Sequence, residues 1–88
     1  MELKSKSIIV TGASSGIGAA AALLFAAEGA NVVLGARRSA ELETLAGKIN
    51  QSDGRAVFLA GDVKDEDYAD ALVGLAMKEF GGAGRRIQ

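Results

Sequence analysis

Apolar residues occur along the chain in two alternating patterns, short continuous runs and longer stretches with helical spacing. The runs IIV, VVL and AVFLA, within residues 7–10, 31–35 and 56–60, predict three strands. Continuous apolar runs of this length are typical of strands buried on both faces of a parallel sheet. The pattern therefore predicts a sheet that is covered on its faces by the intervening stretches.

Each run is followed by a stretch that predicts a helix. Residues 17–28 are rich in alanine, and Gly29 is placed to end them. The second helix is expected to begin near Ser39, a residue type favoured as an N-cap. Its apolar positions recur at helical spacing and are Leu42, Leu45 and Ile49.

The third helix is expected to open with acidic residues at 65–67, where negative charge is favoured, and to end at Gly81 and Gly82. Its apolar face consists of Ala69, Leu72, Val73, Ala76 and Phe80. Strand and helix thus alternate three times, which predicts an α/β fold with a parallel sheet, right-handed crossovers and strand order 3-2-1. Residues 83–88, AGRRIQ, show no strand character, so the predicted sheet is truncated before a fourth strand.

Composition excludes several classes of function. The chain has 88 residues, a formal net charge of −1 and a pI near 5.3, so we expect no nucleic-acid partner. Because Cys and His are both absent, disulfides, thiolate metal sites and catalysis by imidazole or thiol are excluded, and we expect no metal. The N-terminus does not have the pattern of a secretion signal, and apolar residues 19–27 are too few to span a bilayer. We therefore expect a cytoplasmic protein without membrane contact.

The run TGASSGIG at 11–18 lies where the first strand should end and the first helix begin. Backbone N–H groups and the positive end of a helix dipole converge at such a turn, and an anionic phosphate fits there. Gly12 would allow the tight turn, Gly16 the close approach of a pyrophosphate, and Gly18 the packing of helix on strand. These residues predict a site for a dinucleotide.

Two other interpretations of the glycine motif were considered. A nucleoside-triphosphate P-loop requires Lys and then Ser or Thr after the last glycine, and Ala19 and Ala20 stand there instead. A glycine-rich turn without a ligand is the remaining alternative. Ser14 and Ser15 are assigned to the phosphate loop and not to nucleophilic catalysis, since no base lies beside them in the sequence.

The residues after the second strand bear on the choice of cofactor. In dinucleotide-binding units a carboxylate at this corner takes the ribose 2′-hydroxyl, whereas an arginine accommodates a 2′-phosphate. Here the corner reads Gly35, Ala36, Arg37, Arg38, with no carboxylate. The planar fork of a guanidinium matches a phosphate, so we expect NADP rather than NAD. The alternative is a pair of ordinary solvated loop residues.

Asp62 and Val63 follow the third strand. They are placed to receive an adenine, with the carboxylate accepting from the amino group and the valine packing against the ring. An N-cap role for Asp62 in the third helix is an equally open alternative.

Three segments together, TGASSGIG at 11–18, GARR at 35–38 and GDV at 61–63, resemble the N-terminal half of a short-chain dehydrogenase/reductase. The resemblance implies a Rossmann-type fold and hydride transfer between NAD(P) and an alcohol or carbonyl. It also implies that full-length relatives are homo-oligomers. By the same resemblance, the pyrophosphate and ribose would be lined by Gly12, Ser14, Ile17 and Gly18, the 2′-phosphate by Arg37, and the adenine by Asp62 and Val63.

The sequence departs from this family in its chemistry. The family uses a Ser, a Tyr-x-x-x-Lys pair and an Asn-Asn-Ala-Gly segment, and none of these occurs here, since Tyr68 is followed four positions later by Leu72. We therefore assign no catalytic residue and expect the cofactor-binding part of an oxidoreductase that is inactive alone. The alternatives are a nucleotide-binding module that stands alone or complements a separate C-terminal half, and a nonfunctional gene product.

The sequence predicts a partial dinucleotide-binding domain at 1–82 and an aberrant tail at 83–88. In this family the third helix is commonly followed by a fourth strand such as Leu-Asp-Val-Ala-Phe-Asn. One extra base before codons for that strand gives Ala-Gly-Arg-Arg-Ile-Gln, the residues found at 83–88. We hypothesise a single-base frameshift after residue 82; a tail of arbitrary composition is the alternative.

Overall fold

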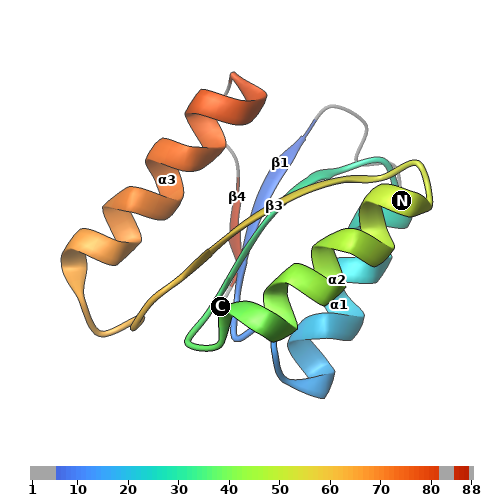
Figure 1. Cartoon of the computed structure of the whole chain (residues 1–88). Coiled ribbons are helices and arrows are strands. Elements are labelled where there is room, and N and C mark those ends of the chain that lie inside the picture. The colour runs from blue at the N-terminus through green and yellow to red at the C-terminus, as the bar shows by residue number, and fades with distance from the viewer. Residues whose placement is uncertain (1–5, 82–84, 88) are drawn as a thin grey trace.

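The computed structural model describes residues 6–81 and 85–87. They form a parallel sheet in the order β3-β2-β1-β4, with α1 and α2 on one face and α3 on the other (Figure 1). The elements along the chain are β1 Ser7–Thr11, α1 Gly16–Ala27, β2 Asn31–Ala36, α2 Ser39–Gln51, β3 Arg55–Ala60, α3 Glu66–Phe80 and β4 Arg85–Ile87.

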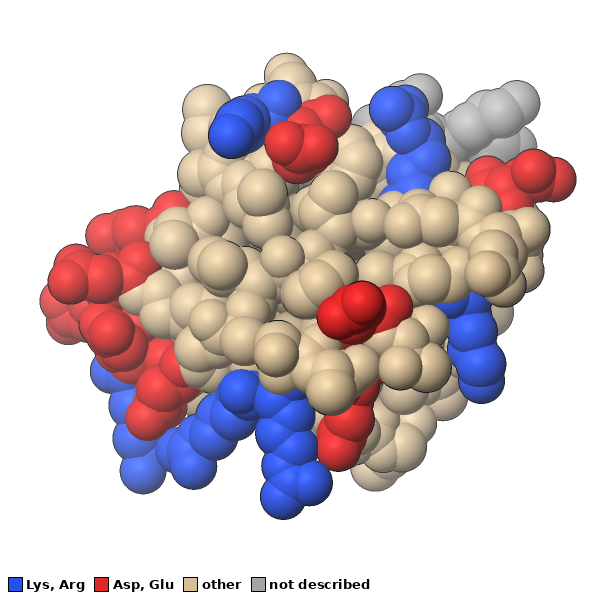
Figure 2. Space-filling view, in the orientation of Figure 1, with Lys and Arg blue, Asp and Glu red and all other residues tan. Residues whose placement is uncertain are grey.

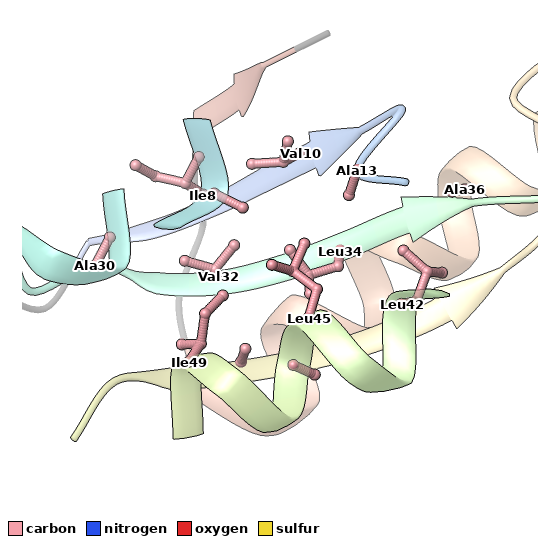
Figure 3. Packing of buried hydrophobic residues seen from close by; sticks show 13 residues of the cluster. Ile8, Val10, Ala13, Ala30, Val32, Leu34, Ala36, Leu42, Leu45 and Ile49 are labelled. Atoms are coloured by element: carbon pink, nitrogen blue, oxygen red, sulfur yellow. The ribbon is translucent and has the colours of Figure 1, made fainter. Parts of the chain in front are cut away.

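The larger core lies between the sheet and the pair α1 and α2. Side chains of alternate strand residues point to this face, because successive residues of a strand face opposite sides of the sheet. Figure 3 shows this packing, in which Val32 and Leu34 of β2 lie among the residues of α2. The α2 side chains that pack there, Leu42, Leu45, Ala46 and Ile49, are all buried, as the helical spacing predicts.

The smaller core lies under α3. Ile9 and Val33, which alternate with the residues of the first core, face this side of the sheet. They pack against Tyr68, Leu72 and Ala76 of α3. Both faces of β1 and β2 are therefore buried, which is the physical reason for their uninterrupted apolar runs.

The predicted Rossmann-type order of strands and helices is confirmed, including the arrangement of the first three strands as 3-2-1. The prediction that Ser39 is the N-cap of the second helix is wrong. Ser39 is the first residue of α2, and the N-cap is Arg38, whose side chain makes no capping hydrogen bond. At the end of α3, Gly81 has a φ of 71° and closes the helix in the left-handed conformation, as its sequence position predicts.

The expectation that no strand follows α3 is corrected. Residues Arg85–Ile87 form β4, a short strand that pairs in parallel with β1, with Ile9 opposite Arg86. Strand pairing uses backbone N–H and C=O groups, and the free edge of β1 offers a row of them whatever side chains the partner has. Residues 82–84 and 88 of the predicted boundary and tail lie outside the described residues. The division at residue 82 and the frameshift stay predictions.

Two kinds of feature are absent from residues 6–81 and 85–87. No helix in them has the length and apolar character needed to cross a bilayer. The same residues hold no group of three or more His, Cys, Asp or Glu side chains that could bind a metal ion.

Candidate functional site

A cleft of about 630 Å³ opens at the edge of the sheet where β1, β2 and β3 end. In a parallel sheet all strands end at the same edge, so the segments that follow them converge there. Five predicted site residues line the cleft: Gly12, Ser14, Arg37, Arg38 and Val63. The other five, Ser15, Gly16, Ile17, Gly18 and Asp62, belong to the same connections but do not line it.

The turn from β1 into α1 is held by Ser15. Its Oγ donates to the carbonyl of Gly12 at 2.8 Å and accepts from the N–H of Gly18 at 3.1 Å, which makes it the N-cap of α1. Gly12 has a φ of 67°, a conformation that favours glycine. Ser15 therefore shapes the turn, and its hydroxyl is already engaged with the backbone.

Gly16 and Gly18 have opposite surroundings. A Cβ on Gly18 would lie 2.1 Å from the carbonyl oxygen of Gly12, so only glycine lets the helix approach the strand end. A Cβ on Gly16 would meet nothing within 4 Å. The space in front of Gly16 is open, which is what the close approach of a ligand requires.

The same turn presents unpaired donors. Among the described residues, the N–H groups of Ser14, Gly16 and Ile17 have no hydrogen-bond partner. Of the helices in this part of the chain, α1 is also the one with no acidic residue in its first turn. Free N–H groups at the positive end of an uncharged helix match a phosphate in charge and hydrogen bonding, so the residues present fit the pyrophosphate of a dinucleotide.

Arg37 and Asp62 meet across the ends of β2 and β3. The Nη2 of Arg37 lies 3.4 Å from the Oδ2 of Asp62, and both side chains remain largely exposed, at 70% and 48%. The strand ends are joined by a hydrogen bond from the N–H of Gly61 to the carbonyl of Ala36 at 2.9 Å. A guanidinium therefore stands at the margin of the cleft and is accessible to an anion.

Arg38 has a different partner. Its Nη1 lies 3.4 Å from the Oε1 of Glu41, which is in the first turn of α2, and both side chains are exposed. An exposed pair of this kind contributes little to stability, about 0–1 kcal/mol. Arg38 lines the cleft, so a second cation is available beside Arg37.

The open alternative for Asp62 is resolved against the N-cap role. Asp65 is the N-cap of α3, and its carboxylate accepts from the N–H of Asp67 at 2.9 Å. Asp62 instead accepts from the N–H of Lys64 at 2.9 Å, within the connection that precedes the helix. Figure 2 shows acidic side chains gathered over the first turns of α3, at the left of the molecule.

Two apolar side chains near this edge are unusually exposed. Ile17 in the first turn of α1 is 87% exposed, and Val63, which lines the cleft, is 57% exposed. Covering a large apolar side chain removes it from water and lowers the free energy. Both positions are therefore suited to contact a flat or ring-shaped ligand, as the sequence predicts for Val63 and an adenine.

Sequence reasoning missed the floor of the cleft. Tyr68 lines it and is nearly buried, and its hydroxyl donates to the carbonyl of Leu59 at 2.5 Å. Two glycines make room for it, because a Cβ on Gly35 would lie 2.6 Å from the hydroxyl and one on Gly61 2.3 Å from the ring. Burial raises the pKa of Tyr68 above its usual value, and a backbone hydrogen bond at Ala36 partly opposes the shift. The sequence signal for this buried ring was a glycine after each of two apolar runs, at Gly35 and Gly61.

Comparison with known proteins agrees with this geometry. The family model for short chain dehydrogenases matches residues 6–84, which include every strand and helix from β1 to α3. The chain belongs to the short-chain dehydrogenase family. Members of this family bind NAD(P), which is the class of ligand that the turn and the cleft fit.

Two curated relatives match nearly the whole of this chain but only about a third of their own length. An uncharacterized oxidoreductase of Listeria innocua is 47% identical over 81 residues, covering 92% of this chain and 33% of the relative. A 3beta-hydroxysteroid dehydrogenase of Eggerthella lenta is 43% identical over 83 residues, covering 92% and 31%. The chain therefore spans about a third of the length of the curated relatives it matches.

Two solved structures superpose closely on this chain. The hydroxysteroid dehydrogenase from Escherichia coli gives a TM-score of 0.91 at 30% identity, covering 97% of this chain and 36% of that one. The L-sorbose reductase from Gluconobacter frateurii, solved with NADPH and L-sorbose, gives 0.87 at 39% identity, covering 94% and 32%. These values show the shared fold over the described strands and helices.

Proposed function

We propose that this chain is the cofactor-binding part of an oxidoreductase that transfers hydride between NADP(H) and an alcohol or carbonyl. The observation that carries the proposal is the β1–α1 turn, which offers three unpaired N–H groups and open space at Gly16. In this assignment the N–H groups of Ser14, Gly16 and Ile17 bind the pyrophosphate. Ser15 and Gly18 hold the turn in the conformation that aims them.

The adenosine end of the cofactor is assigned to the β3–α3 connection and to the side chain of Ile17. Val63 and Ile17 are exposed apolar surfaces for the adenine and ribose, and Asp62 has a carboxylate near Val63 that can accept from the adenine amino group. When bound, the cofactor would donate the hydride to a carbonyl or accept it from an alcohol. This chain's own residues bind and orient the nucleotide, and among these 88 residues there is no Tyr-x-x-x-Lys pair to move a proton.

NADP is preferred over NAD because of Arg37. Arg37 lines the cleft and its side chain is 70% exposed, and Arg38 stands next to it. A carboxylate, which would repel a 2′-phosphate, is absent at Ala36. The L-sorbose reductase that superposes on this chain was solved with NADPH, which supports the same choice.

The turn is tested by titrating the 88-residue chain with NADPH and NADH. Gly16→Val places a branched side chain in the open space before the free N–H groups, so we expect both affinities to fall about tenfold or more, equivalent to ~1.4 kcal/mol. Gly74→Val is the matched control, because Gly74 is also helical with nothing within 4 Å of a Cβ. Unchanged affinity in Gly16→Val would remove the basis of the proposal.

The 2′-phosphate assignment is tested separately. Arg37→Gln should weaken NADPH binding by about 10- to 100-fold and leave NADH nearly unaffected, since a hydrogen bond to a charged group is worth about 1.5–3 kcal/mol. Equal losses for the two cofactors would contradict a phosphate contact at Arg37. The pyrophosphate assignment would stand in that case.

A further inference from the structure

We propose that Asp62 weakens the NADP(H) preference of this chain by holding the Arg37 guanidinium in competition with the 2′-phosphate. The inference rests on the proposed function, because it concerns the same nucleotide site. It adds a specificity-determining residue whose carboxylate lowers the advantage of NADP(H) over NAD(H).

The geometry gives the two oxygens of Asp62 separate partners. Oδ1 accepts from the N–H of Lys64 at 2.9 Å, which fixes the carboxylate within the turn after β3. Oδ2 is thereby directed toward Arg37 and lies 3.4 Å from its Nη2. The carboxylate is therefore anchored by the backbone at one oxygen and engages the guanidinium with the other.

The two residues are held in register by the sheet. Ala36 pairs with Ala60 at the ends of β2 and β3, and the N–H of Gly61 donates to the carbonyl of Ala36. Arg37 directly follows β2, and Asp62 follows β3 after the single residue Gly61. The backbone pairing at the ends of β2 and β3 therefore brings Arg37 and Asp62 close to each other.

A bound 2′-phosphate would meet this carboxylate through Arg37. A phosphate takes two donors of the guanidinium fork for a bidentate contact, and one of them, Nη2, faces Asp62. The phosphate also carries negative charge, so the same carboxylate repels it at short range. NAD(H) has no group there and loses nothing. Removing the carboxylate charge should therefore favour NADP(H) selectively.

The test compares Asp62→Asn with the unaltered chain by calorimetric titration with NADP⁺ and NAD⁺. Asparagine keeps an oxygen for the N–H of Lys64 and removes the charge. We expect the ratio of Kd for NAD⁺ to Kd for NADP⁺ to rise roughly 2- to 5-fold, the range of exposed charge pairs. Any loss of adenine contact affects both nucleotides and cancels in this ratio.

Two further variants sharpen the test. Glu79→Gln removes the same charge near the C-terminal end of α3, about 20 Å along the helix from its first residue at 1.5 Å per residue, and should leave the ratio unchanged. In an Arg37→Gln background, Asp62→Asn should raise the ratio less, because competition for the guanidinium is gone and only the direct repulsion between carboxylate and phosphate remains. Asp62→Ser, which retains an acceptor for Lys64, replaces Asp62→Asn if the latter does not fold.

The outcomes separate the two levels of inference. If Arg37→Gln lowers the ratio and Asp62→Asn leaves it unchanged or lowers it, the role of Asp62 is wrong and the NADP assignment stands. If Asp62→Asn raises the ratio equally without Arg37, competition for the guanidinium is wrong. If Arg37→Gln has no effect on the ratio, the NADP assignment and the role of Asp62 both fail.

Discussion

The β1–α1 and β3–α3 connections lie at the same edge of the sheet and have opposite electrostatic character. The first is capped by the neutral hydroxyl of Ser15, and the first turn of α1 has no acidic residue. The second is capped by the carboxylate of Asp65, with Glu66 and Asp67 in the first turn of α3. Each cap accepts a hydrogen bond from one N–H group of its helix. Only the first connection leaves the positive end of its helix without a negative charge and so available to an external anion.

This difference shows how one fold directs a ligand to one of several similar turns. At α3 the protein supplies its own negative charge, which stabilises the helix and repels a phosphate. At α1 it leaves N–H groups unpaired, and a ligand is needed to complete them. The contrast can be tested by making each turn more like the other.

The largest expected effect is on the backbone packing of the first turn. Gly18→Val would force a side chain against the carbonyl of Gly12, which a Cβ approaches to 2.1 Å, and no flexible neighbour can give way. We expect the free energy of unfolding to fall by about 3 kcal/mol, the upper end of the cost of overpacking. Urea denaturation followed by circular dichroism measures it.

Gly16→Val is the internal comparison for Gly18→Val, two residues away in the same turn. Its side chain would enter open space, so stability should change by less than about 0.5 kcal/mol, as for surface substitutions. Equal destabilisation by both variants would contradict the different surroundings of the two glycines, with Gly18 packed against the strand end and Gly16 facing open space.

These two glycines also show how far the sequence specifies the site. Their roles follow from spacing alone, because one must lie where the helix crosses the strand end and the other where the turn faces outward. The placement of Asp62 does not follow from spacing, since Asp62 and Asp65 are both good caps and only the local geometry selects Asp65. The β4 strand could not be predicted because its pairing is made by backbone groups.

The Tyr68 floor was missed for a similar reason. Gly35 lies far in the sequence from both Gly61 and Tyr68, and only the register of β2 with β3 brings the two glycines to one side chain. The elements of the fold, by contrast, could be predicted because burial on both faces leaves an unmistakable apolar run in β1 and β2.

The second prediction gives the α1 turn the charge of the α3 turn. Ile17→Glu places a carboxylate in the first turn of α1, at a side chain that is 87% exposed. We expect affinity for NADPH to fall about tenfold, ~1.4 kcal/mol. Stability should rise by about 0.3–1 kcal/mol, since a negative charge there favours the helix. NADPH titration should show weaker binding while urea denaturation of the same variant shows a higher free energy of unfolding.

Ile17→Gln is the control for that experiment. It removes the same apolar contact without adding charge, so its binding loss gives the part due to the side chain alone. A loss as large as that of Ile17→Glu would show that charge at this helix end is unimportant.

The third prediction compares the two caps. Ser15→Ala and Asp65→Ala each remove a side-chain acceptor for a helix N–H, at Gly18 and Asp67, and should each cost about 1 kcal/mol of stability. Only Ser15→Ala should also weaken nucleotide binding, because Ser15 shapes the turn that carries the free N–H groups. Thermal melting and NADPH titration of the same samples check both parts, and reduced binding by Asp65→Ala would contradict the division of roles.

The smallest expected effect concerns Tyr68, the residue that fastens α3 beside the cleft. Its pKa is raised by burial, so the neutral phenol is favoured in the folded state. The resulting stability is fully present below pH 10, the ordinary pKa, and is lost as the pH rises through the higher folded-state value. Tyr68→Phe isolates this contribution, because the two proteins differ only in the phenol hydroxyl.

Tyr68→Phe should be less stable than the unaltered chain by about 1 kcal/mol at neutral pH, since the carbonyl of Leu59 loses its donor. That difference should stay constant up to about pH 10 and shrink above it, because phenolate can no longer donate and must be desolvated. Since Tyr68 is the one tyrosine in the chain, ultraviolet absorbance follows its ionisation directly. A stability difference that does not depend on alkaline pH would show that Tyr68 titrates as freely in the fold as in the unfolded chain.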